Sequence, residues 1–191
     1  MQALEEKILR EGKVLPGNIL KVGNFLNHQL DVEFIMEMGK EIAELYKDSG
    51  INKIVTIETS GIAIAVAAAA HMHVPVVFAK KNKTSNISDG VFSTIVHSFT
   101  HGIDYKVVIS KEFLDENDNI LIIDDFLALG NALNGLIDIA SQAKAKVAGF
   151  AIAIEKGFQG GGDKLREKGY RVESLAIVDS MNDDSLVFRK Q

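Results

Sequence analysis

Apolar residues follow helical spacing in several stretches of this chain. Behind a cap at Asp31, apolar side chains recur three or four residues apart until Gly50, which marks the stop. Gly61 opens an alanine-rich helix that ends near Met72. Further helices are predicted over residues 3–10, 131–143 and 163–168.

Short runs of β-branched and apolar residues predict strands between these helices. They cover residues 53–58, 75–79, 119–123, 147–154 and 170–177, with a short extended piece at 19–22. Residues 92–99 and 105–110 alternate between apolar and polar side chains, which indicates a hairpin arm, and the polar stretch 80–90 is typical of a flexible loop. Strands that alternate with helices form βαβ units. We therefore predict an α/β fold with a mostly parallel twisted sheet and helices on both faces.

Composition indicates an ordinary globular protein. With 191 residues, the chain fits one medium domain, which we expect to span residues 1–191. The net charge of -5 argues against general nucleic-acid binding, which needs clustered Lys and Arg. There is no Cys, so neither disulfides nor thiolate metal sites can form. Residues 1–10 do not have the pattern of a signal peptide, and the longest apolar run, 62–70, is shorter than the ~20 residues that span a bilayer. We expect a cytoplasmic protein with no membrane partner.

Polar or charged residues directly follow several of the predicted strands. In open parallel sheets, ligands bind beyond the carboxyl ends of the strands, so these residues are the candidates for a site. They are the loop Glu58, Thr59, Ser60 and Gly61, the pair Lys80 and Lys81, the pair Asp124 and Asp125, and the pair Glu155 and Lys156.

The segment after residues 121–123 combines two kinds of chemistry. Asp124 and Asp125 end the apolar strand, and Gly130 stands just before a predicted helix. A loop that enters a helix presents unpaired backbone N–H groups and a favourable dipole to a phosphate. The two carboxylates instead accept hydrogen bonds from hydroxyls such as the 2′- and 3′-OH of a ribose. A ribose with a 5-phosphate satisfies both halves, and two acids that cap the next helix are the alternative.

This order of apolar strand, two acids, short loop, Gly and helix resembles the signature of the type I phosphoribosyltransferases. The resemblance implies that Asp124 and Asp125 are catalytic residues that fix the ribose of a 5-phosphoribosyl diphosphate. The family usually has Thr at two loop positions that are Leu129 and Ala132 here, so backbone N–H groups and the Asn131 amide would bind the phosphate instead. The implied 5-phosphate loop is Ala128, Leu129, Gly130, Asn131 and Ala132.

The same resemblance implies a diphosphate site after the first core strand. The family has a short diphosphate-binding loop there, and residues 58–61 occupy that place, with Ser60 as a simple helix cap the alternative. Residues 80–83 are basic, and a basic segment beside a diphosphate stabilises the leaving group and excludes water. Lys81 is the candidate among them, against the alternative of a solvated surface loop. Mg²⁺ is expected with the diphosphate, held largely by ligand oxygens and water.

Lys156 stands where family members that use oxopurines place a Lys at a late strand end. Its ammonium is a donor only, so it bonds a 6-oxo group and rejects an amino group. The stretches 25–29, 56–62, 122–127 and 154–156 extend the resemblance over nearly the whole chain. They imply an N-terminal hood, residues 1–30, in which Leu20 packs on the base and Asn27 bonds its edge. By themselves, Lys156 is typical of a surface ion pair, Leu20 of a core and Asn27 of a turn.

The resemblance as a whole implies a homodimeric purine-salvage enzyme. It would transfer the 5-phosphoribosyl group from its diphosphate to N9 of xanthine, with no nucleic-acid partner. Guanine or hypoxanthine as the base is one alternative. A regulator that senses the diphosphate and binds nucleic acid is another, and the net charge of -5 counts against it. The spacing of the His residues is not that of a zinc site, and we assign no metal-binding residue.

Overall fold

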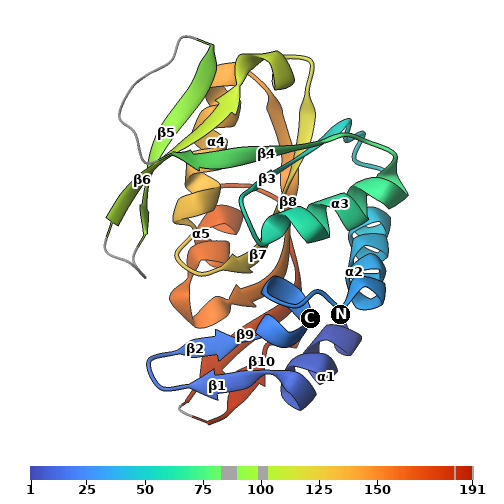
Figure 1. Cartoon of the computed structure of the whole chain (residues 1–191), viewed down its shortest axis with the longest axis vertical. Coiled ribbons are helices and arrows are strands. Elements are labelled where there is room, and N and C mark those ends of the chain that lie inside the picture. The colour runs from blue at the N-terminus through green and yellow to red at the C-terminus, as the bar shows by residue number, and fades with distance from the viewer. Residues whose placement is uncertain (83–89, 99–102, 183, 191) are drawn as a thin grey trace.

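The computed structural model describes residues 1–82, 90–98, 103–182 and 184–190 (Figure 1). These described residues form an eight-stranded sheet with the strand order β10-β9-β8-β7-β3-β4-β6-β5. Parallel pairing joins β4 (Val76–Asn82), β3 (Lys53–Ile57), β7 (Asn119–Leu127), β8 (Lys146–Lys156) and β9 (Val172–Met181). Antiparallel pairing adds β10 (Leu186–Phe188) at one edge and β6 (Ile103–Ser110) and β5 (Val91–Ser98) at the other. The predicted α/β fold with a mostly parallel sheet is confirmed.

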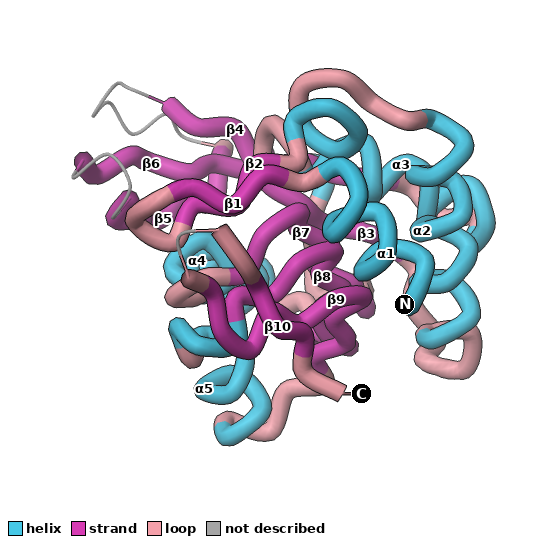
Figure 2. The backbone as a smooth tube through the Cα atoms, turned by 90° about the horizontal axis from the view of Figure 1, so that it is seen from below, coloured by secondary structure: helices cyan, strands magenta, loops and turns pink. Residues whose placement is uncertain are grey.

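Helices cover both faces of this sheet (Figure 2). One core cluster joins α2 (Val32–Leu45) and α3 (Gly61–Met72) to β7 through Ile123. The other joins α4 (Asn131–Ala143) and α5 (Gly161–Glu167) to the same strand through Ile122. Successive side chains of a strand point to opposite faces, so these two neighbours belong to different clusters.

The N-terminal hood packs beside β9 of the sheet. It consists of α1 (Gln2–Glu11), a hairpin of β1 (Lys13–Leu15) and β2 (Ile19–Lys21), and a helical turn, Gly23–Asn27. The N-terminal amino group donates a hydrogen bond to the carbonyl oxygen of Leu175 in β9, and α1 contacts the same strand. The turn between β1 and β2 reaches the end of β8, where Nζ of Lys156 donates to the backbone oxygen of Asn18.

Several predicted helix boundaries are confirmed. α3 and α4 begin and end at the predicted residues. Asp31 caps α2, because its side chain accepts a hydrogen bond from the backbone N–H of Phe34 at 3.2 Å. Ser60 is the N-cap residue of α3, as the alternative interpretation has it, but its side chain makes no capping hydrogen bond.

Several predicted strand ends are wrong, because the ladders continue through polar residues. Asp124 lies within β7 and pairs with Ile152, and β7 runs on to Leu127. Lys80 and Lys81 lie within β4 and not in a loop, where they pair with β6. A ladder is held by backbone groups, so a charged side chain that faces a cavity or solvent does not end it.

The predicted hairpin arm is confirmed in part. β5 and β6 pair antiparallel from Val91 opposite Ser110 to Ser98 opposite Ile103. Two segments of this region lie outside the described residues. They are the connection 99–102 and the rest of the predicted flexible loop, residues 83–89, which includes Lys83. The short β10 was not predicted from the sequence. Across the described ranges, no helix is both long and apolar enough to cross a membrane.

A close approach between α2 and α3 depends on Gly39. A Cβ atom at this position would lie 2.4 Å from the carbonyl carbon of Ala67 and 2.7 Å from the backbone nitrogen of Ala68. Both neighbours are backbone atoms, so a side-chain rotation cannot relieve the contact. The glycine therefore sets the distance between the two helices that cover this face.

We predict that Gly39→Ala destabilises the fold by about 1–3 kcal/mol, the usual cost of overpacking. For a chain of this size, each kcal/mol lowers Tm by roughly 2–4 °C. Thermal unfolding followed by circular dichroism measures the change. Lys40→Ala, at an exposed position of the same helix, is the control. A Tm for Gly39→Ala equal to that of the control would show that the helices can separate freely.

Candidate active site

The carboxyl ends of β3, β7 and β8 bring the predicted polar residues to one edge of the sheet. Asp124 is only 6% exposed, although it is a charged residue type. One of its carboxyl oxygens, Oδ1, accepts the backbone N–H of Asp125 at 2.9 Å. Burial raises the pKa of Asp124 well above its usual range, and the neighbouring charge of Asp125 raises it further.

Thr56 adds an unpaired hydroxyl beside this acid. Its Oγ1 is buried and has no hydrogen-bond partner among the described residues. A Cβ atom at Gly61 would lie 2.3 Å from that oxygen and 3.3 Å from Oδ1 of Asp124. Gly61 therefore lets α3 begin directly against the two oxygens. Thr56 was not predicted as a site residue, because it stands inside an apolar strand.

The predicted diphosphate residues lie together. Glu58 at the end of β3 accepts the backbone N–H of Lys81 from β4. The peptide between Glu58 and Thr59 is cis. The ammonium of Lys81 lies 5.2 Å from the centre of the Tyr105 ring, a cation–π distance. Burial raises the pKa of Tyr105, and the charge of Asp124 adds to the effect, so Tyr105 faces the same region.

Gly130 shapes the predicted phosphate loop. Its φ of 85° is in the left-handed region, where glycine is favoured because it has no Cβ. It stands at the N-cap of α4, and no side chain caps the helix there. The first N–H groups of a helix have no partner within the helix, which is the arrangement that binds a phosphate.

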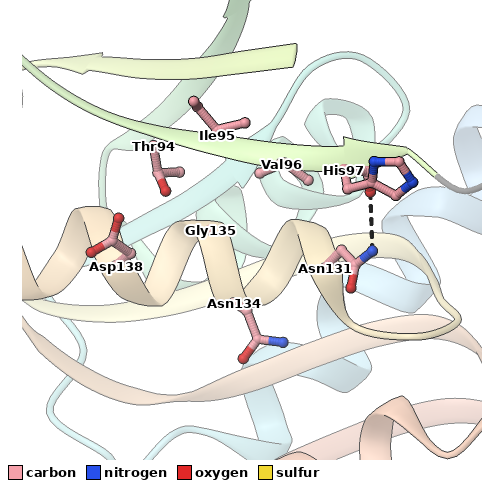
Figure 3. Close-up of a pocket in the computed structure, with 8 residues that line it drawn as sticks. All are labelled: Thr94, Ile95, Val96, His97, Asn131, Asn134, Gly135 and Asp138. Carbon is pink, nitrogen blue, oxygen red and sulfur yellow. Dashed lines mark hydrogen bonds between the residues drawn. The ribbon is translucent and has the colours of Figure 1, made fainter. Parts of the chain in front are cut away.

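The side chain of Asn131 does not point into this loop. Its amide donates to the backbone oxygen of His97 in β5 at 3.0 Å (Figure 3). It lines a surface pocket of about 500 Å³ between β5 and α4, and no other predicted site residue lines that pocket. This leaves the backbone N–H of Asn131, rather than its amide, for a phosphate.

The predicted base-binding residues come from the hood, which contains Leu20 and Asn27, and from the end of β8, where Lys156 contacts the hood. Lys156 donates from Nζ to the backbone oxygen of Asn18 at 2.9 Å. Its ammonium also lies 5.9 Å from the centre of the Phe126 ring. Burial lowers the pKa of Lys156, because the charged form loses solvent. The amide of Asn27 makes a long 3.5 Å contact with a carboxyl oxygen of Asp125.

These contacts connect the hood to the sheet edge at two places, Asn18 with Lys156 and Asn27 with Asp125. Leu20 is 7% exposed and belongs to the core cluster, so its free face toward a ligand is small. Phe126 and Asn18 were not predicted. Asn18 contributes a backbone oxygen, which every residue has, so its residue type does not mark it as a contact. In the structure its φ is 60°, in the left-handed region.

The predicted site residues offer a ligand a small set of polar groups. The described residues contain no group of three or more His, Cys, Asp or Glu that could hold a metal ion. The predicted site residues and Thr56 provide one pair of acids, an ammonium on either side, and amide and hydroxyl groups. Such a set suits a neutral polyol flanked by anionic or carbonyl acceptors.

Comparisons with known proteins agree with this chemistry. A family model described as "Phosphoribosyl transferase domain" matches residues 22–182. The chain is 53% identical over 188 residues to a protein of Finegoldia magna named "Xanthine phosphoribosyltransferase". The matched region covers 98% of this chain and 99% of that relative. It is 54% identical over 191 residues to a protein of the same name from Lachnoclostridium phytofermentans, across 99% and 98% of the two chains.

Solved structures with a similar fold include the APRTase from Giardia lamblia complexed with 9-deazaadenine. The TM-score is 0.76, the identity is 22%, and the likeness covers 92% of this chain and 98% of that one. The adenine phosphoribosyltransferase of Thermoanaerobacter pseudethanolicus has a TM-score of 0.72 at 20% identity, over 91% and 98% of the chains. At these identities the likeness concerns the fold alone.

The raised pKa of Asp124 predicts how stability depends on pH. The folded protein holds this proton more tightly than the unfolded chain, whose ordinary value is 3.8. The contribution is fully present below about pH 4 and is lost as pH rises through the folded pKa. Asp124→Asn, which has no charge to bury, should therefore be more stable than the wild type at pH 7, by a margin that shrinks toward pH 4.

Urea unfolding at several pH values between 4 and 7 measures this difference. Asp48→Asn, at an exposed position, is the control and should follow the wild type. A parallel pH dependence for Asp124→Asn and the wild type would show that Asp124 titrates normally.

Proposed function

The chain belongs to the phosphoribosyl transferase domain family, and from that premise we propose that it is a purine-salvage enzyme acting on xanthine. It transfers the 5-phosphoribosyl group from 5-phosphoribosyl diphosphate to N9, giving xanthosine 5′-monophosphate and diphosphate. The N9–C1′ bond forms as the bond between C1′ and the diphosphate oxygen breaks. The bonding electron pair leaves with the diphosphate, and the imidazole-ring proton of xanthine is released to solvent. The relatives at 53% and 54% identity that carry the name xanthine phosphoribosyltransferase support this assignment.

The observation that carries the proposal is the half-buried ammonium of Lys156 at the same sheet edge as the two acids. Its one hydrogen bond given by the structure goes to a backbone oxygen of the hood, at 2.9 Å. A 6-oxo group of a purine can take the place of that oxygen or share the ammonium with it, because Lys has three donors. Asn27 is next to Asp125, so an amide stands between the base side and the ribose side. An amide both donates and accepts, which suits the ring N–H and 2-oxo groups of xanthine.

Ribose and phosphate have separate partners in this mechanism. Asp124 and Asp125 accept hydrogen bonds from the ribose hydroxyls and orient C1′. The backbone N–H groups of Ala128–Ala132, ahead of α4, bind the 5-phosphate. Leu20 limits the base pocket on the hood side. Since the protein forms no covalent bond in this scheme, positioning and electrostatics provide the rate enhancement.

The leaving diphosphate is assigned to residues 58–61 and to Lys81. Mg²⁺ enters with this diphosphate and neutralises part of its charge. Oxygen atoms of the diphosphate and water would coordinate the cation, since Mg²⁺ prefers oxygen ligands and keeps several waters. Glu58 accepts the backbone N–H of Lys81, which orients the strand that carries the ammonium.

A homodimer in the cytoplasm completes the proposal. Light scattering at micromolar concentration should give twice the chain mass of 20.8 kDa. A monomer at that concentration would remove the dimer from the proposal and leave the reaction untouched.

The choice of base is tested by steady-state kinetics with three purines. We predict that kcat/KM is higher for xanthine than for guanine or hypoxanthine. A preference for guanine of more than about tenfold, roughly 1.4 kcal/mol, would make the base assignment wrong. No turnover of any of them, together with tight sequence-selective DNA or RNA binding in a gel shift, would favour a regulator instead.

Lys156→Ala tests the residue on which the proposal depends. A hydrogen bond to a charged group contributes about 1.5–3 kcal/mol, so kcat/KM for the oxopurine should fall roughly 10- to 150-fold. Thermal unfolding should stay close to that of the wild type. Lys21→Ala, at an exposed position of the β1–β2 hairpin that Lys156 contacts, is the control and should retain activity. An unchanged rate for Lys156→Ala would remove Lys156 from the mechanism.

A further inference from the structure

Gly161, the first residue of α5, lies directly against the phosphate loop. Its backbone N–H donates to the oxygen of Ala128 at 3.1 Å. A Cβ atom at Gly161 would lie 2.2 Å from that oxygen, 2.7 Å from the carbonyl carbon of Leu129 and 2.9 Å from the nitrogen of Gly130. All three neighbours are backbone atoms of the loop, so its conformation and the position of α5 are fixed together.

Gly162, the next residue, lies against the other end of the site. A Cβ atom there would lie 2.1 Å from Oε1 of Glu155, the residue before Lys156. Glu155 is fully buried, so its side chain is not exposed to a ligand. Arg166 of α5 donates to its two oxygens at 2.8 Å and 2.7 Å, and Ser174 of β9 donates to one of them.

This ion pair is a rigid connection. A fully buried carboxylate needs its partners, since removing one leaves an uncompensated charge. The planar fork of Arg166 fixes the direction of the carboxylate as well as its distance. Arg166 also donates to the backbone oxygen of Val172 at 3.2 Å. The end of β8 is therefore held from α5 and from β9 at once.

One short helix thus contacts both parts of the site. We propose that α5 is a positioning element that sets the 5-phosphate loop, through Gly161, and the Lys156 strand end, through Gly162 and the Arg166–Glu155 pair. It fixes the separation between the phosphate and the base of the nucleotide product. The proposal rests on the proposed function for the identity of the two ligands.

The two contacts predict separable kinetic effects. Gly161→Ala pushes against the loop, so KM for 5-phosphoribosyl diphosphate should rise about tenfold or more, while KM for xanthine changes less than about twofold. Arg166→Lys loses the bidentate fork and should do the reverse. Ser174→Ala removes one bond to the same carboxylate and should raise KM for xanthine by a smaller factor. Lys164→Ala, at an exposed position of α5, should match the wild type.

Thermal unfolding and direct calorimetric titration with ribose 5-phosphate accompany the kinetics. Ribose 5-phosphate affinity should fall in Gly161→Ala and stay unchanged in Arg166→Lys and Ser174→Ala. If Gly161→Ala does not fold, the base-side pair carries the test on its own. A lowered Tm with both KM values intact would overturn the proposal, because α5 would then be merely structural. Parallel changes in both KM values for every variant would overturn the assignment of one contact to each ligand.

The wild type is measured first with xanthine and with guanine, so failure of the proposed function is visible separately. A wild type that prefers guanine changes the base and leaves the test intact, with KM for guanine as the readout. An unchanged ribose 5-phosphate affinity in a folded Gly161→Ala variant contradicts the positioning role whichever base is used.

Discussion

β7 lies between β3 and β8, and its parallel pairing with both brings three strand ends to one edge of the sheet. Asp124 pairs with Ile152, and Leu127 pairs with Glu155. The two acids of β7 therefore lie beside the last residues of β8, which lead to Lys156. The strand end of β3 delivers Glu58 and the start of α3 to the same edge. A one-residue slip in this ladder would turn each of these side chains to the opposite face.

Burial at this edge acts on an acid and on a base in opposite directions. It raises the pKa of Asp124 and lowers the pKa of Lys156, and in both cases the neutral form gains. Ribose hydroxyls that donate to the acid, and an oxo group that accepts from the ammonium, would favour the charged forms again. Under the proposed function, the substrate therefore adds hydrogen-bond partners that stabilise the charged forms of both residues.

The sequence predicted the helices better than the strands, for a physical reason. α3 and α4 begin beside Gly61 and Gly130, where the apolar spacing also changes, so both signals mark the same boundary. Strand ends were placed at the first charged residue, whereas backbone pairing carries β7 and β4 past Asp124 and Lys80. The carboxyl-end rule still gathered Glu58 with Lys81, and the family resemblance placed Asn27, which contacts Asp125, at the same site. Asn18 and Gly161 act through backbone atoms, which no side-chain pattern can reveal.

A crystal structure with bound xanthosine 5′-monophosphate tests the central claim most directly, because the product spans both halves of the site. The account predicts its 6-oxo oxygen within about 2.7–3.2 Å of Nζ of Lys156. It also predicts the ribose hydroxyls on Asp124 and Asp125, and the 5′-phosphate on the backbone N–H groups of residues 128–132. A 5′-phosphate bound beside Lys81, or a base whose 6-oxo oxygen lies beyond hydrogen-bond distance of Nζ of Lys156, would contradict it.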